Sequence, residues 1–145
     1  MAYSALLVLS DEAEYLSHFK KDYCDKGSVT TPGGLVVKFR ERHFKHAFYE
    51  AAGRVTGDKS VFSITRTQRM NWVAEALKDP TADVYQGYDN QKKCPSPNRR
   101  VSISNGNYVV VSEVEKNGEA TFVTAFVANA GALTKIRTNP KWTGK

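Results

Sequence analysis

The fold is decided by the stretch from residue 99 to residue 127, which reads RRVSISNGNYVVVSEVEKNGEATFVTAFV. It contains strand-like runs separated by the pairs Asn105-Gly106 and Asn117-Gly118. Asn and Gly tolerate the positive φ that both central residues of a type I′ turn require, so Asn-Gly between β-rich runs is a strong hairpin signal. The stretch therefore predicts an antiparallel meander.

Two-residue turns at both Asn-Gly pairs would fix the register of the meander, with Ser104 opposite Asn107 and Lys116 opposite Glu119. One face, the predicted core face, would then carry Val101, Ile103, Tyr108, Val110, Val123, Ala125 and Val127. The second face would carry Arg100, Ser102, Val109, Val111, Glu113, Phe122, Thr124 and Phe126. This mixed second face is either a working surface or an ordinary solvent-exposed face.

The flanking sequence predicts helices and two further strands. Apolar residues at helical spacing predict helices over residues 11–24, 41–54 and 60–80, the second ending at Gly53. Ser63 is a candidate N-cap of the third helix, and a capping box of Thr65 with Gln68 is the alternative. Residues 34–39 and 83–89 read as strands. The predicted class is α+β, with N-terminal helices packed on one face of a four-stranded, mostly antiparallel meander sheet.

The composition is that of a soluble globular domain. The chain has 145 residues, 41% of them hydrophobic and 25% charged, so residues 1–145 are most simply one domain. No apolar run is long enough for a membrane span, and the start lacks the marks of a signal peptide, so we expect a cytoplasmic protein with no membrane partner. A net charge of +6 favours polyanion partners, RNA among them.

The sequence disfavours phosphate-loop nucleotide hydrolysis and metal-dependent nuclease chemistry. The sequence has no phosphate-binding loop, no HExxH, no GxSxG and no zinc-ligand spacing, so we expect no metal and no cofactor. RNA can be cleaved without a metal because its own 2′-hydroxyl is the nucleophile, and such a site needs a proton-transfer group and cations.

Several side chains could supply those groups. His46 or His43 could transfer the proton, and Thr124 offers a hydroxyl on the sheet. Three arginines could bind phosphate, namely Arg66, Arg69 and Arg100. The alternative is that these histidines are ordinary helix-boundary residues and that the arginines are solvated. Further RNA contacts could come from Tyr85, Lys135, Arg137 and Trp142, unless the C-terminal segment simply packs onto the domain.

The order of several motifs resembles a known family. HAFYE, RTQRMNWVAEALKDP, RRVSI, YVVVSEVE and FVTAFVA follow one another as in phage-associated members of the barnase, EndoU, colicin and RelE-like nuclease superfamily. The resemblance covers residues 34–142 as the nuclease-like core, with residues 1–33 as an N-terminal helical extension. It implies a metal-independent endoribonuclease in which His46 is the acid/base, Arg69 and Arg100 bind phosphate, and Thr124 is the hydroxyl of the last strand.

The leading hypothesis is therefore an endoribonuclease that leaves a 2′,3′-cyclic phosphate on tRNA or mRNA. It would be a phage or mobile-element toxin or effector in a bacterial or phage-infected cell, with a protein inhibitor as a further partner. The alternative is a non-catalytic RNA- or protein-binding phage accessory protein on the same fold. The predicted register places Arg100 and Thr124 opposite the core face, so His46 must reach around a sheet edge, or a β-bulge must exchange the faces of one strand.

Overall fold

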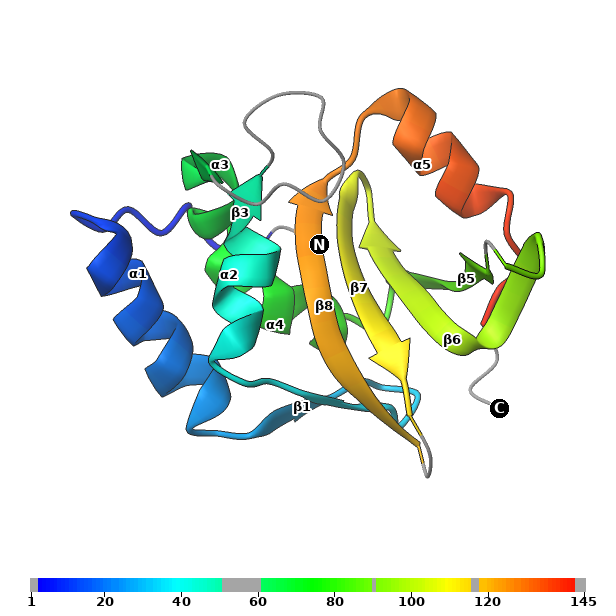
Figure 1. Ribbon diagram of the computed structural model, residues 1–145, viewed down its shortest axis with the longest axis horizontal. Coiled ribbons are helices and arrows are strands. Elements are labelled where there is room, and N and C mark those ends of the chain that lie inside the picture. Colours follow the sequence, from blue (N-terminus) through cyan, green and yellow to red (C-terminus); the bar gives the residue numbers. More distant parts are fainter. Residues whose placement is uncertain (1–2, 51–60, 90, 116–117, 143–145) are drawn as a thin grey trace.

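The sheet is larger than the sequence predicts. The computed structural model describes residues 3–50, 61–89, 91–115 and 118–142. Within these residues, six strands form one sheet in the order β1-β2-β8-β7-β6-β5 (Figure 1). Their bounds are β1 Ser28–Thr30, β2 Val36–Lys38, β5 Asp83–Asp89, β6 Cys94–Asn105, β7 Tyr108–Val114 and β8 Glu119–Val127. The α+β class is confirmed, but β1 and β2 extend the four-stranded meander β5 to β8, so the predicted strand number is wrong.

The first hairpin of the meander is shifted from its predicted register. Asn105 pairs with Tyr108 across a turn at Gly106 and Asn107, whereas the prediction paired Ser104 with Asn107. Gly106 has the positive φ expected of it, 59°, but neither Asn105 nor Asn107 does, so the predicted type I′ turn with Asn105 and Gly106 at its centre is wrong. The shift is an even number of residues, so the side chains of β6 and β7 keep their predicted faces. The prediction for the second turn involves Lys116 and Asn117, which lie outside the described residues.

The second hairpin follows the predicted register until a β-bulge interrupts it. Val110 pairs with Ala125 and Val111 with Thr124, as predicted, but Ser112 then pairs with Phe122, so one residue of β8 is extra. That residue is Val123, which was expected in the core. The bulge reverses the faces of the preceding part of β8. Phe122, predicted for the second face, therefore lies in the core with 1% of its surface exposed.

The helices are shorter and more numerous than predicted. The helix over residues 11–24 is present as α1 Glu12–Phe19 and a π-helical turn η1 Lys20–Cys24, and Asp11 caps its start. The helix predicted over residues 41–54 is only α2 Arg42–Phe48, because Tyr49 turns to extended backbone and pairs with Phe62. This pairing joins β3 Tyr49–Glu50 to β4 Val61–Phe62. The predicted stop at Gly53 lies outside the described residues.

The helix predicted over residues 60–80 is divided in two. Ser63 caps α3 Ile64–Thr67 by accepting a hydrogen bond from the Arg66 backbone, so the first of the two capping predictions is confirmed. Arg69, with φ −102° and ψ 17°, then interrupts the helix before α4 Met70–Lys78 begins. A further helix, α5 Ala130–Arg137, follows β8 and was not predicted.

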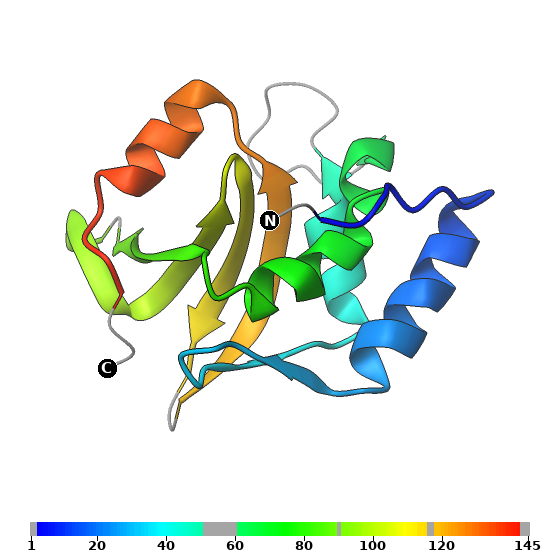
Figure 2. The same ribbon diagram turned by 180° about the vertical axis from the view of Figure 1, so that it is seen from behind.

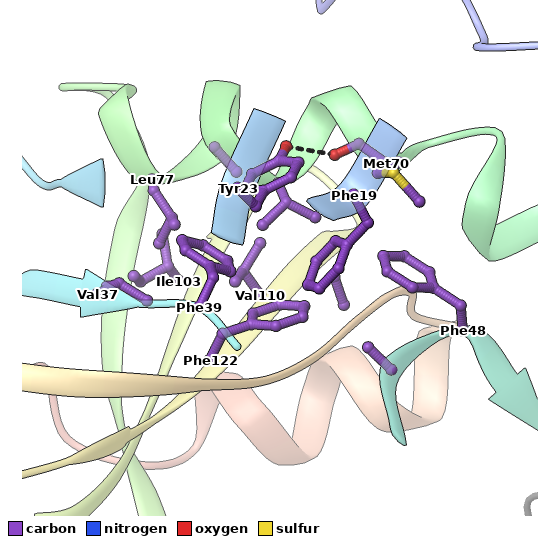
Figure 3. Close-up of a cluster of buried hydrophobic side chains, with 14 of the residues drawn as sticks. Phe19, Tyr23, Val37, Phe39, Phe48, Met70, Leu77, Ile103, Val110 and Phe122 are labelled. Carbon is purple, nitrogen blue, oxygen red and sulfur yellow. Dashed lines mark hydrogen bonds between the residues drawn. The ribbon is translucent and has the colours of Figure 1, made fainter. Parts of the chain in front are cut away.

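The core lies between the sheet and the helices of the N-terminal half (Figures 1 and 2). Figure 2 shows α4 crossing the near face of β7 and β8. Figure 3 shows Phe19 and Tyr23, from the N-terminal segment, among Phe39, Phe48 and Phe122. Burying an aromatic side chain of this kind contributes about 1.5–3 kcal/mol. Residues 1–33, expected as an addition to the domain, thus supply a central part of its core.

Candidate functional site on the sheet

A row of side chains crosses the sheet face opposite the core. Tyr85 pairs with Ser102, Ser102 with Val111, and Val111 with Thr124, so the four side chains project from one face of β5, β6, β7 and β8. The next row contains Arg100, on the same face of β6 as Ser102. We call this surface the α5 face, because α5 lines a groove along it. Arg100 and Thr124 therefore share a face.

Arg66 reaches the Thr124 end of this row from α3. Its Nη1 atom lies 3.2 Å from the Ala47 carbonyl oxygen and 3.4 Å from Thr124 Oγ1. The guanidinium also lies over the Phe126 ring, 5.7 Å from its centroid. Thr124 Oγ1 is in turn 3.5 Å from the Ala47 carbonyl oxygen. A guanidinium and a hydroxyl thus meet at β8, beside the C-terminal end of α2.

His46 lies next to this junction in the chain. It precedes Ala47 in α2, and its side chain is exposed, whereas Phe44, Ala47 and Phe48 of the same helix are buried. The exposed position suits a group that exchanges protons with a bound ligand. The helix itself packs against β8, so the His46 backbone is held beside the strand that carries Thr124.

His43, the other candidate histidine, points into the protein. Only 7% of its surface is exposed, and its Nδ1 atom accepts a hydrogen bond of 2.9 Å from the Arg40 backbone. Burial, together with the smaller effect of the nearby charges of Arg42 and Arg40, lowers the pKa of His43 to about 4. His43 is thus neutral near pH 7. This placement favours a structural role over contact with RNA.

Arg69 lies apart from Arg100 and Thr124. Its guanidinium covers the Trp72 ring at 5.1 Å, and its Nη1 donates to the Thr65 carbonyl at 2.8 Å. Its carbonyl oxygen accepts from the Tyr108 hydroxyl, and Tyr108 belongs to the core cluster. Arg69 therefore sits on the core side of the sheet, which the N-terminal helices cover, whereas Arg66 contacts Thr124.

Arg100 lines the groove between the α5 face and α5. The groove has a volume of about 570 Å³ and is lined by Gly87, Arg100, Ser102, Val111, Lys135, Ile136, Thr138 and Asn139. Its two charged lining residues, Arg100 and Lys135, are both cations. Lys135 was predicted from the sequence, whereas Thr138 and Asn139 were not, because a helix was not expected here.

The remaining predicted RNA-binding residues lie around the C-terminal segment. Tyr85 is 8% exposed, and Lys141 lies 5.3 Å above its ring while pairing with Asp83 at 2.6 Å. Arg137 Nη2 donates to the Gly106 carbonyl at 3.4 Å. Trp142 packs against the core cluster, so its ring belongs to the opposite side of the sheet from Tyr85. Trp142 therefore packs onto the domain, which was the alternative to RNA contact for the C-terminal segment.

Comparisons with known proteins returned no relatives. No protein-family model, no curated protein and no solved structure matches this chain. Within the described ranges, none of the helices is long and apolar enough to cross a membrane.

Proposed function

We propose that the protein binds RNA across the α5 face and cleaves it beside Thr124 by attack of the 2′-hydroxyl. The observation that carries this proposal is the contact of Arg66 with Thr124. The contact joins a guanidinium to a hydroxyl on the face that also presents Arg100, which lies two strands across and two residues along from Thr124, or about 12 Å at the usual strand dimensions. A guanidinium is suited to phosphate because its donors form a planar fork.

The reaction requires one proton to leave and one to arrive. The 2′-oxygen forms a bond to phosphorus as the bond from phosphorus to the 5′-oxygen breaks, giving a 2′,3′-cyclic phosphate and a 5′-hydroxyl. His46, in its neutral form, takes the proton of the 2′-hydroxyl and becomes an imidazolium, and a water molecule protonates the leaving 5′-oxygen. Arg66 and the Thr124 hydroxyl stabilise the charge on the phosphate oxygens, and Arg100 holds the neighbouring phosphate.

The biological setting is part of the same proposal. An endoribonuclease of this kind acts on tRNA or mRNA in the cytoplasm of a bacterial or phage-infected cell, as a toxin or effector of a phage or mobile element. A cell that makes it needs a means of restraint, and a protein inhibitor that covers the α5 face would provide one.

A second candidate function is RNA binding without cleavage. It is favoured by the placement of Arg69, which the resemblance implied as a phosphate ligand but which lies with Trp72 on the helix-covered face. His43 is also buried, which leaves His46 as the candidate for proton transfer on α2. On this alternative, the α5 face binds single-stranded RNA through its cations alone.

The test is an RNA cleavage assay in EDTA. Purified protein is incubated with a short RNA and with the same sequence carrying 2′-deoxyribose, and the products are analysed for a 2′,3′-cyclic phosphate. We expect cleavage of the RNA and none of the deoxy substrate, because the latter lacks the nucleophile. RNA that is bound but left intact at micromolar protein would support the second candidate instead.

The Thr124→Val variant tests the site itself. Valine keeps the volume of threonine but removes the hydroxyl, and loss of a donor to a developing charge typically costs about 10²-fold in rate. The matched control is Thr121→Val on the same strand, where the hydroxyl donates to Glu115 instead. Equal cleavage rates for the two variants would refute the assignment of Thr124.

A further inference from the structure

We infer that the groove between α5 and the sheet is a subsite for one nucleotide of the RNA strand. This inference rests on the proposed function in one respect, since the groove adjoins the row that leads to Thr124. Its volume of about 570 Å³ lies within the range of about 300–1,000 Å³ that is usual for small-molecule sites. The groove offers partners for two parts of a nucleotide, its phosphate and its base.

The phosphate matches the charged end of the groove. Arg100 comes from β6 and Lys135 from the last turn of α5, so the two cations reach the groove from opposite walls. Both are exposed, and the other lining residues are uncharged. A dianionic or monoanionic phosphate between them would release counterions from both, which favours binding at moderate salt.

The base matches the apolar walls. Val111 forms part of the sheet floor and Ile136 projects from α5, and each is half-buried, so they present apolar surface to the groove from two sides. A planar base inserted between them would bury apolar area that water now covers. Asn139 lies in the same lining, and its amide offers both donors and an acceptor to a base edge.

The position of Arg100 is fixed by a glycine on the adjacent strand. A Cβ atom at Gly87 would lie 2.8 Å from both the Cβ and the carbonyl oxygen of Arg100. The β5 backbone therefore approaches Arg100 more closely than any side chain would permit. The two residues line the same groove, so this close approach brings the strand backbones together where Arg100 enters the groove.

The experiment is a titration of the full chain with uridine 5′-monophosphate, followed by amide chemical shifts in NMR. Inorganic phosphate, uridine and a tetra-aspartate peptide are the comparison probes. We expect saturable binding of the nucleotide, with shifts at Ser102, Val111 and Asn139, and at least fivefold weaker binding of phosphate or uridine alone. Equal binding of the acidic peptide would overturn the inference, because it would show a site for negative charge only.

Two variants separate the parts of the subsite. Lys135→Ala should weaken nucleotide and phosphate alike by at least fivefold, whereas Asn139→Ala should weaken the nucleotide but leave phosphate unchanged. The control is Lys26→Ala, which removes the same charge from an exposed turn next to β1, at the opposite edge of the sheet. Unchanged nucleotide binding in both groove variants would overturn the inference.

The two proposals fail separately. If the wild-type protein leaves RNA intact but the nucleotide binds and the groove variants weaken it, the subsite stands and the cleavage proposal falls. If RNA is cleaved but the groove variants bind nucleotide as the wild type does, cleavage stands and the subsite falls.

Discussion

Arg66 is the side chain that connects the helices to the α5 face. It starts from α3, contacts the end of α2 through the Ala47 carbonyl, and reaches Thr124 and Phe126 on β8. Its position is partly buried, so the guanidinium is held by the protein before any ligand arrives. Preorganised charge of this kind stabilises a transition state at little reorganisation cost.

The Arg66→Lys variant should therefore lose activity although it keeps the charge. A lysine ammonium cannot present two parallel donors to a phosphate and would lose the contact with the Phe126 ring. We expect a decrease in the rate of RNA cleavage of more than tenfold, measured in EDTA under single-turnover conditions. The matched control is Arg69→Lys, on the helix-covered face, for which we expect less than a threefold decrease. A larger decrease for Arg69→Lys than for Arg66→Lys would instead support Arg69 as the phosphate-binding residue.

The choice between these two arginines could not be made from the sequence. Arg66 and Arg69 are three residues apart, so one continuous helix would place them on the same face. The chain leaves the helical conformation at Arg69, between α3 and α4, and the two side chains part. The sequence suggested the residue types of the candidate site, but the break that separates the two arginines depends on packing between distant segments.

Among the elements, β5 approaches the neighbouring strand β6 unusually closely at one glycine. Its register shifts between Gln86 and Gly87, and Gly87 then lies against the backbone of Arg100. A residue other than glycine would force the two strands apart at this point. The shape of the groove floor therefore depends on Gly87 having no Cβ atom.

We predict that Gly87→Ala destabilises the fold by roughly 1–3 kcal/mol, the usual cost of overpacking. The added Cβ would lie 2.8 Å from Arg100 atoms, which cannot move without shifting β6. Urea denaturation measures the change. The control is Gly33→Ala, where the nearest atom to a new Cβ is Thr31 Oγ1 at 3.9 Å, and we expect no loss there. A Gly87→Ala protein as stable as the wild type would contradict the prediction and would mean that β6 can move away from the added Cβ.

The elements were predictable where local signals act alone. The Asn-Gly pair between β-rich runs predicted the meander, and Ser63 marked a true helix start. α2 ends early because Tyr49 pairs with Phe62, a contact between separate segments. α5 was not predicted because none of its residues is buried, so it lacks the apolar stripe by which a helix is recognised.

Across the domain, Asp79 joins segments that are far apart in the sequence. Its carboxylate accepts hydrogen bonds from the Tyr3 hydroxyl at 3.0 Å, from the Thr81 backbone at 2.8 Å and from the Asn105 side chain. Burial alone would raise the pKa of Asp79, but the hydrogen bonds from Thr81, Asn105 and Tyr3 outweigh it and lower the pKa to about 2. One carboxylate thus holds together the N-terminal segment, the end of α4 and the end of β6 through hydrogen bonds.

We predict that Asp79→Asn destabilises the protein by roughly 2–3 kcal/mol at pH 7, because it removes charge-assisted hydrogen bonds and leaves donors facing an amide. Urea denaturation of the variant and of the exposed control Asp25→Asn gives the difference. The folded-state pKa lies below the ordinary value of 3.8, so the stabilisation is complete above pH 3.8 and is lost as the pH falls toward 2. If the difference in unfolding free energy between the two variants stayed constant as the pH fell from 3.8 toward 2, the prediction would be wrong.

The bulge in β8 has a consequence for how this chain can change in length. Val123 is the extra residue between Phe122, which faces the core, and Thr124, which faces the groove side. Deleting it would leave Phe122 opposite Ser112 and Thr124 opposite Val111, with their faces already alternating as in a regular strand. A relative that lacks this residue would keep Phe122 in the core and Thr124 on the α5 face. The two sequences would then align with a gap in the middle of a strand.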